Sequence, residues 1–344
     1  MHNLQNTLYI TTQHAYVHLD NNTLRVDIER ETRLRVPMHH LNGIVCFGNV
    51  LVSPALMHRL ADEGKHLVFL SEHGRFKARL EGPVSGNILL RQTHHRRTEC
   101  PDFVLGIARA LVAGKLKNSR TLLLRGAREA SDAEENQTLT RLADNLAASL
   151  RATEKTSSLD ALRGIEGEAA RNHFSGLNLI VKPAMRDDFQ LDGRTRRPPL
   201  DRFNALLSFL YSLLMNDCRS ALEAVGLDPQ LGFLHAVRPG RAALALDLQE
   251  EFRSVLADRL ALTLINRGQL KARDFDNREG GAVMLNDQGR KAVITAWQER
   301  RQEELTHPLL EQKIPLALLP LMQARLMART LRSEMPGYIP FQAR

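Results

Sequence analysis

The feature that most constrains the fold is a change in the period of the hydrophobic side chains. Residues 1–85 contain β-rich runs, and within them residues 24–28 alternate apolar and polar side chains, which is typical of a strand. From Asp102 onwards, apolar side chains recur every three or four residues, which indicates helices. The sequence therefore predicts an α+β protein in which a β-rich N-terminal domain over residues 1–92 precedes a larger all-helical domain over residues 93–344.

Composition narrows the class of protein that fits this pattern. With 344 residues and 43% hydrophobic content, the chain can bury the cores of two domains. Its 47 Lys and Arg residues outnumber its 39 Asp and Glu residues, and the net charge of +8 favours a polyanionic partner. The three cysteines form no Cys-x-x-Cys pair, and we see neither a secretion signal nor an apolar run long enough for a membrane span. We therefore expect a cytoplasmic protein that does not insert into membranes.

Three helices of the second domain can be bounded from the sequence. Residues 159–181 and 203–225 carry apolar side chains at helical spacing, and Gly226 is expected to end the second of these helices. A last helix is expected over residues 308–333. Because the helix over 203–225 is apolar on most faces, we expect it to lie at the buried centre of its domain.

Two basic segments of the second domain are candidates for surface roles. His94 and His95 are adjacent, so they project to different sides of a strand or helix, and no Cys or carboxylate cluster accompanies them. We expect both imidazoles to lie on a solvated basic surface. Three arginines lie within residues 194–197, in a loop over residues 186–202 that either contacts phosphates or is only a connector.

A candidate site begins at His235, which lies in a Gly/Pro-rich loop over residues 232–241. In the helix that follows, Asp247 and Glu250 are three residues apart, so both carboxylates can face the same side and bind a divalent metal. The alternative is that these acids point to solvent and only offset the helix dipole. Spacing alone favours that second interpretation.

A second candidate segment is the helix that carries Arg163 and Glu166. Gly164 and Gly167 flank the glutamate, and a glycine within a helix costs about 1 kcal/mol relative to alanine. Such a cost suggests that something approaches the backbone closely. The alternative is that the small residues allow another helix to pack there, and the sequence leaves both open.

Four stretches, taken in order along the chain, resemble the motifs of one family. They are Gly-Ile-Glu-Gly-Glu at 164–168, the segment 196–211, Gly226-Leu-Asp-Pro229 with Gly232-Phe-Leu-His235, and the segment 246–253. This ordered set is similar to the CRISPR-associated adaptation endonucleases, the larger of the two universal spacer-integration proteins. Further stretches at 86–92 and 115–120 are also similar to family motifs. The resemblance spans nearly the whole chain and suggests subtype I-C.

The resemblance implies a role for individual residues. The family's metal ligands match Glu166, His235 and Glu250, and a further family acid matches Asp247, which would orient a ligand or a water molecule. Two carboxylates and one imidazole form a mixed oxygen and nitrogen site that suits Mn²⁺ and tolerates Mg²⁺. Glu251 stands where relatives of this subtype often have proline, which leaves open whether Glu250 or Glu251 faces the metal.

Basic residues are also implied as DNA contacts. Arg163 and Arg238 match basic family positions, and Arg241 is a further candidate for contact with a phosphate.

The resemblance further implies how the protein acts and assembles. Family members form homodimers, for which we expect the β-rich domain to be used, and two dimers flank a dimer of a small ferredoxin-like adaptation partner in a heterohexamer. In that assembly the 3′-hydroxyl ends of a short DNA duplex attack the repeat of a CRISPR array by metal-assisted transesterification, and isolated members cut DNA. The alternative is a basic DNA-binding scaffold without catalysis. The joint presence of Glu166, His235 and Glu250 argues against that alternative.

Overall fold

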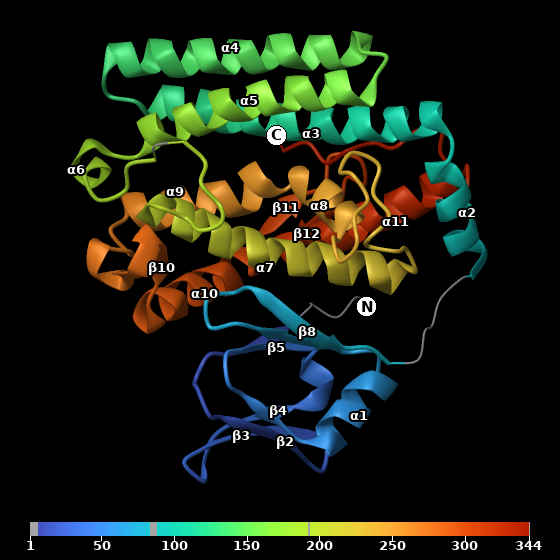
Figure 1. Cartoon of the computed structure of the whole chain (residues 1–344), viewed down its shortest axis with the longest axis vertical. Coiled ribbons are helices and arrows are strands. Elements are labelled where there is room, and N and C mark those ends of the chain that lie inside the picture. The colour runs from blue at the N-terminus through green and yellow to red at the C-terminus, as the bar shows by residue number, and fades with distance from the viewer. Residues whose placement is uncertain (1–5, 83–87, 192, 344) are drawn as a thin grey trace. The chain divides into compact units, whose positions relative to one another are not determined.

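The structure is a computed structural model that describes residues 6–82, 88–191 and 193–343. Two compact units make up the chain, Met1–Ser85 and Gly86–Arg344. Strands dominate the first unit and helices the second, which confirms the predicted α+β class (Figure 1). The predicted boundary at residue 92 falls inside helix α2 (Ile88–Thr98), a few residues after the point where the two units divide. Residues 86 and 87 of the family-like stretch 86–92 lie outside the described residues.

The first unit contains two four-stranded sheets. One sheet has the strand order β1-β5-β7-β8, and the other has the order β4-β3-β2-β6. Within the first sheet β1, β5 and β7 are parallel and β8 is antiparallel to β7. The elements are β1 (Thr7–Ile10), β2 (Tyr16–Asp20), β3 (Thr23–Ile28), β4 (Glu31–Pro37), η1 (Met38–His40), β5 (Gly43–Phe47), β6 (Leu51–Val52), α1 (Pro54–Asp62), β7 (His66–Leu70) and β8 (Phe76–Leu80).

The core of the first unit follows from the alternation seen in the sequence. Leu24 and Val26 of β3 are buried, and β3 pairs with β2 in the antiparallel hairpin that joins Asp20 to Thr23. Leu56 and Leu60 of α1 are buried in the same hydrophobic cluster. The side-chain oxygen of Ser53 accepts a hydrogen bond from the backbone N–H of Leu56, which caps the N-terminus of this helix.

The second unit is built mainly from long helices. They are α2 (Ile88–Thr98), α3 (Pro101–Glu129), α4 (Ala133–Lys155), α5 (Leu159–Ile180), α6 (Pro183–Arg186), α7 (Arg202–Val225), α8 (Ala243–Glu250), the π-helix η2 (Arg253–Asp258), α9 (Arg259–Asn266), α10 (Asp287–Gln302) and α11 (Leu319–Leu331). Short 3₁₀ turns are η3 (Ala272–Asp274), η4 (Glu279–Gly281) and η5 (Leu316–Leu318). Two antiparallel ribbons pair β9 (Phe275–Asn277) with β10 (Val283–Leu285) and β11 (Glu304–Thr306) with β12 (Lys313–Pro315), so the unit is predominantly rather than wholly helical.

Helices α3, α4 and α5 lie side by side and share one hydrophobic core (Figure 1). Helix α7 packs against α8, η2 and α11, and most of its residues are buried, as predicted for residues 203–225. It ends at Gly226, whose φ of 89° is the left-handed conformation that glycine adopts readily at a helix end. None of the helices among the described residues is both long and apolar enough to cross a membrane.

The predicted last helix over 308–333 is wrong at its start. Residues 313–318 form strand β12 and the turn η5, and α11 begins only at Leu319. Proline removes a backbone donor and disfavours helical geometry in the residue before it, and this stretch contains Pro308, Pro315 and Pro320. Only Pro320 lies in the first turn of α11, where its missing N–H costs nothing.

Candidate active site

Two of the predicted ligands meet at a lysine that the sequence analysis assigns no role. The ammonium of Lys115, on α3, forms an ion pair with Oε1 of Glu166, on α5. The same nitrogen lies 2.8 Å from Oε2 of Glu250, the last residue of α8. The structure therefore brings these two carboxylates, from separate helices, to one buried cation.

Asp247 and Glu250 lie on the buried side of α8, at 0% and 2% exposed surface. The alternative that these acids point to solvent is therefore wrong. The neighbouring Leu244 and Leu248 are also buried, because α8 packs against α3, α7 and α11 and leaves little of its surface to water. Charges in such a place require partners.

Asp247 fixes the loop that carries His235. Its carboxylate accepts hydrogen bonds from the backbone N–H groups of Phe233, Leu234 and His235, at 2.6, 3.0 and 2.9 Å. It also lies 2.6 Å from Nδ1 of His235. Gly232 makes this approach possible, because a Cβ atom there would lie 2.8 Å from the Asp247 carboxylate.

The bond between His235 Nδ1 and Asp247 determines which imidazole nitrogen is available for chemistry. With Nδ1–H donating to the carboxylate, Nε2 is left as the acceptor, and it lies 3.9 Å from Oε1 of Glu250. The His235 side chain retains 22% of its surface exposed. Such a carboxylate–imidazole pair is the usual arrangement behind a metal-binding histidine.

Glu250 is held in its ionised form by neighbouring cations. Burial alone would raise the pKa of its carboxyl, but the guanidinium of Arg253, at 2.8 Å, and the ammonium of Lys115 outweigh burial and hold the pKa at about 2. The group is therefore a carboxylate at neutral pH and can accept a cation.

Glu251 has a different environment. Its carboxyl accepts hydrogen bonds from Tyr338 Oη, from Gln323 at 3.0 Å and from the backbone N–H of Phe341 at 2.6 Å. Burial raises the pKa of this carboxyl to about 8. Glu251 thus secures the C-terminal segment, and the structure places Glu250 rather than Glu251 beside His235.

The donor set fits a hard divalent cation. Carboxylate oxygens from Glu166 and Glu250 and an imidazole nitrogen from His235 are ligands that Mg²⁺ and Mn²⁺ accept. Among residues 6–82, 88–191 and 193–343, no three His, Cys, Asp or Glu side chains stand ready as a metal-binding group. The Lys115 ammonium lies within ion-pair distance of both glutamates.

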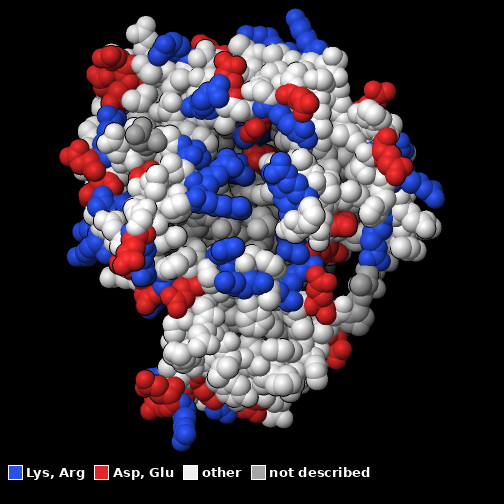
Figure 2. Space-filling model, in the orientation of Figure 1, with Lys and Arg blue, Asp and Glu red and all other residues white. Residues whose placement is uncertain are grey.

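The predicted basic residues lie near this group. Arg163 donates from Nε to the carbonyl of Leu234, at 2.9 Å, and so supports the loop that carries His235. Burial and then the guanidinium of Arg238 lower the pKa of Arg241. Arg163 acts in the same direction, so these three side chains are close enough to interact. Figure 2 shows Lys and Arg side chains gathered on the face of the helical unit turned toward the viewer.

The sequence singles out two other groups of basic residues. Arg194 is not free for phosphate, because it donates to Asn204 at 2.6 Å and lies over the ring of Tyr211. The prediction that both neighbouring histidines are solvated is wrong for His94, which is buried and lies 2.9 Å from the carbonyl of Leu231, whereas His95 is exposed. A helix can bury one of two adjacent residues, since they project to different sides.

The glycines beside Glu166 have an unexpected environment. A Cβ atom at Gly164 or Gly167 would meet nothing within 4 Å among the described residues, leaving aside the helix's own backbone. Packing of a neighbouring helix through these small residues, one of the two interpretations of the sequence, is therefore wrong.

Lys115 and Arg253 were missed by the sequence analysis, although each carries a signal. Lys115 interrupts the buried stripe of α3 between Leu111 and Leu122, and a lysine is almost never buried without a partner. Arg253 follows Glu250 by three residues, the spacing at which opposite charges meet on a helix.

Two glutamates that share a buried ammonium, with an imidazole beside one of them and a group of arginines nearby, form a site suited to metal-assisted chemistry on a polyanion. The family model of the CRISPR associated protein Cas1 matches residues 8–299, and the chain belongs to this family. It is 51% identical to the CRISPR-associated endonuclease Cas1 1 of Moorella thermoacetica over 100% of both chains. It is 47% identical to the CRISPR-associated endonuclease Cas1 1 of Chlorobaculum tepidum over 98% of both chains. The predicted family and endonuclease class are thereby confirmed.

Solved structures share the fold at low sequence identity. A Cas1 protein from Thermotoga maritima superposes with a TM-score of 0.81 at 24% identity, covering 95% of this chain and 97% of that chain. A chain of a Cas6-RT-Cas1–Cas2 complex gives 0.84 at 21% identity, covering 100% of this chain and 37% of that chain. A casposase bound to its integration product gives 0.83 at 20% identity, covering 99% and 95%.

Proposed function

We propose that this chain cuts and joins DNA phosphodiester bonds in CRISPR adaptation, using a divalent cation held by Glu166, His235 and Glu250. The observation that carries the proposal is the convergence of Glu166 and Glu250 on the ammonium of Lys115, with His235 Nε2 3.9 Å from Glu250. A site that already gathers positive charge between two carboxylates offers ligands to Mg²⁺ or Mn²⁺.

Each residue of the site has a distinct task in this proposal. Glu166, His235 and Glu250 would hold Mg²⁺ or Mn²⁺, which would supply charge stabilisation at the scissile phosphate and activation of the attacking oxygen. Asp247 holds the Nδ1 proton of His235, so that Nε2 remains an acceptor directed toward Glu250. Lys115 and Arg253 together balance the charges of the two glutamates. The flexible Lys115 side chain would have to leave its position between the glutamates for them to hold a divalent cation.

DNA is bound through its phosphates in this proposal, by Arg163, Arg238 and Arg241. The proximity of these three side chains to each other and to the His235 loop supports this role. Because such binding releases counterions, the affinity for duplex DNA should fall steeply with salt. An affinity that stays constant between low and physiological salt would exclude phosphate-led binding.

The assembly is also part of the proposal. We infer that the chain forms a homodimer through its β-rich unit and joins the small ferredoxin-like partner in a heterohexamer that inserts short duplexes at a CRISPR repeat, with subtype I-C as the type of system. The shared fold of a Cas1–Cas2 complex and of a casposase with an integration product supports this assignment.

The test is integration of a labelled duplex into a repeat-bearing plasmid, with and without the small partner, in Mn²⁺, Mg²⁺ or chelator. Glu166→Gln and His235→Ala should abolish cleavage and integration while duplex binding is retained. Glu168→Gln is the matched control, because Glu168 lies on the same helix and is exposed. If the first two variants keep full activity, or if chelator has no effect, the chain is instead a DNA-binding scaffold.

A further inference from the structure

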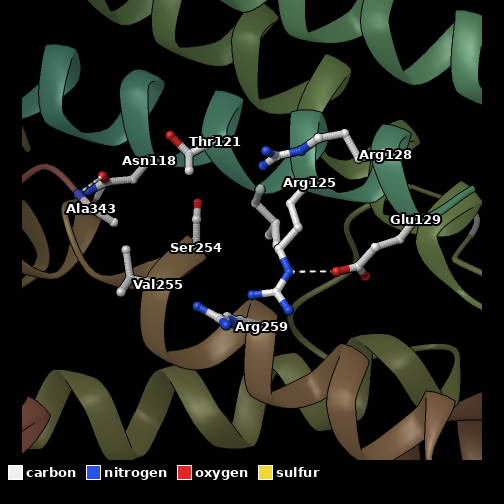
Figure 3. Close-up of a pocket in the computed structure, with 10 residues that line it drawn as sticks. Asn118, Thr121, Arg125, Arg128, Glu129, Ser254, Val255, Arg259 and Ala343 are labelled. Atoms are coloured by element: carbon white, nitrogen blue, oxygen red, sulfur yellow. Dashed lines mark hydrogen bonds and ion pairs between the residues drawn. The ribbon is translucent and has the colours of Figure 1, made fainter. Parts of the chain in front are cut away.

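A second site lies in the helical unit and is lined by none of the residues proposed as metal ligands. It is a pocket of about 390 Å³ bounded by α3, η2, α9 and the C-terminal segment (Figure 3). Its walls are formed by Asn118, Thr121, Leu122, Arg125, Arg128, Glu129, Ser254, Val255, Arg259 and Ala343. The volume is at the small end of the range for ligand sites, and it suits a single small group rather than a duplex.

The pocket has an excess of positive charge. Three of its lining side chains are guanidiniums, from Arg125, Arg128 and Arg259, and one is an acid, Glu129. The acid is paired with Arg125, at 2.7 Å. Arg128 and Arg259 make no hydrogen bond or ion pair from their side chains to any of the described residues. Two guanidiniums at one pocket thus have no direct side-chain partner, although Glu303 and Glu129 act on the charge of Arg259 from a distance.

Arg259 shows the consequence of this arrangement most clearly. It is half-buried, and burial together with the guanidiniums of Arg300 and Arg125 lowers its pKa. In Figure 3 the guanidiniums of Arg125 and Arg259 come from opposite walls and lie near one another. Placing like charges close together in a partly buried pocket is unfavourable. A bound anion would offset that cost through charge-assisted hydrogen bonds.

Hydrogen bonds connect the remaining walls of the pocket. Asn118 donates to the carbonyls of Glu251 and Phe341, at 2.8 and 3.0 Å, and accepts from the N–H of Ala343 at 2.8 Å. The hydroxyl of Ser254 is 2.8 Å from that of Ser119. Because Asn118, Thr121 and Ser254 already have hydrogen-bond partners, the N–H groups of Arg128 and Arg259 are the lining donors left for a ligand.

We propose that this pocket binds a phosphate group, with Arg128 and Arg259 as its contacts and Arg125 turning from Glu129 to join them. A guanidinium can donate two parallel hydrogen bonds to two oxygens of one phosphate. A metal cation would be repelled by the arginines, and an apolar ligand would leave their N–H groups without partners. The group belongs either to a free oligophosphate or to a nucleic-acid strand. Arg125 lies roughly 15 Å from Lys115 along α3. A nucleic-acid strand of a few nucleotides could therefore contact both this pocket and the site at Lys115.

The experiment measures binding to the full chain in chelator, so that no divalent cation contributes. The probes are inorganic pyrophosphate and a short single-stranded oligonucleotide with or without a 5′-phosphate. Arg259→Gln and Arg128→Gln should each weaken binding of the responding probe at least tenfold. Arg141→Gln, which removes an exposed arginine of α4 outside the pocket, should leave it within twofold. Since Arg128 is exposed, its variant keeps the fold and separates binding from misfolding.

A second pair of variants tests the exchange of partners by Arg125. Glu129→Gln should tighten binding several-fold by releasing Arg125, and Glu134→Gln, an exposed acid of α4, should not. A response to pyrophosphate identifies a free oligophosphate as the ligand, and a response only to the oligonucleotide identifies a strand. The proposal is overturned if Arg259→Gln and Arg141→Gln bind every probe equally. It does not depend on the metal site, so loss of one leaves the other intact.

Discussion

Replacement of Lys115 by methionine tests whether its ammonium holds the place of the divalent cation. The ammonium lies 2.8 Å from Glu250, and at an effective permittivity of 20 unit charges at that distance attract by about 6 kcal/mol. Much of that attraction only repays desolvation, and removing one partner of a buried pair costs about 3–5 kcal/mol. In chelator, Lys115→Met should therefore lower the free energy of unfolding by about 3–5 kcal/mol, measured by urea denaturation.

Adding Mn²⁺ should reverse this loss. The cation no longer has to displace an ammonium from Glu166 and Glu250, so Mn²⁺ should bind Lys115→Met at least tenfold more tightly than the unmodified chain, a gain of about 1.4 kcal/mol. Titration calorimetry gives the affinity, and the rise in Tm with Mn²⁺ should be larger in the variant.

Lys117→Met is the matched control, because Lys117 is exposed on the same helix. If Lys115→Met and Lys117→Met bind Mn²⁺ with equal affinity and are equally stable in chelator, the reasoning about the ammonium is refuted.

Two further predictions concern neighbouring groups. Asp247→Asn places an amide against the N–H donors of the His235 loop, so Mn²⁺ affinity should fall roughly 10–100-fold by calorimetry, with the exposed Asp144→Asn unchanged. Burial lowers the pKa of His94 from 6.5 to about 4. Between these two pH values, His94 is protonated in the unfolded chain but neutral in the folded chain, so a falling pH favours the unfolded chain. The free energy of unfolding should therefore fall between about pH 6.5 and pH 4, and His94→Gln should flatten that slope where the exposed His95→Gln does not.

Local sequence signals predict the helices well where caps and periodicity agree. Helix α5 lies at Leu159–Ile180 against the predicted 159–181, and Ser158 caps its first turn. Helix α7 ends at Gly226 as predicted. The segment before α11 is different. Its apolar residues predict a longer helix, but the prolines there prevent helical hydrogen bonding, and the segment forms β12 and η5 instead.

Only part of the candidate metal site can be predicted from the sequence, because the rest depends on how distant helices pack. His235 and Asp247 are near in sequence, and the loop geometry that joins them follows from Gly232 and the four bonds to one carboxylate. The approach of Glu166 depends on how α3, α5 and α8 pack, and helical spacing contains no information on that. Resemblance to a family grouped these residues, and the structure adds Lys115, which lies between them.

The open space beside Glu166 gives Gly167 a function that can be tested. Because a Cβ atom there would touch nothing within 4 Å, Gly167→Ala should stabilise α5 by about 1 kcal/mol. If a DNA strand passes over this face to reach Glu166, the added methyl group should also reduce cleavage. Gly106→Ala on α3 has the same open surroundings away from the site, so it should gain stability and keep full activity. Equal activity in both variants would mean that no ligand approaches the α5 backbone. The presence of glycine at positions 164 and 167 would then need another explanation.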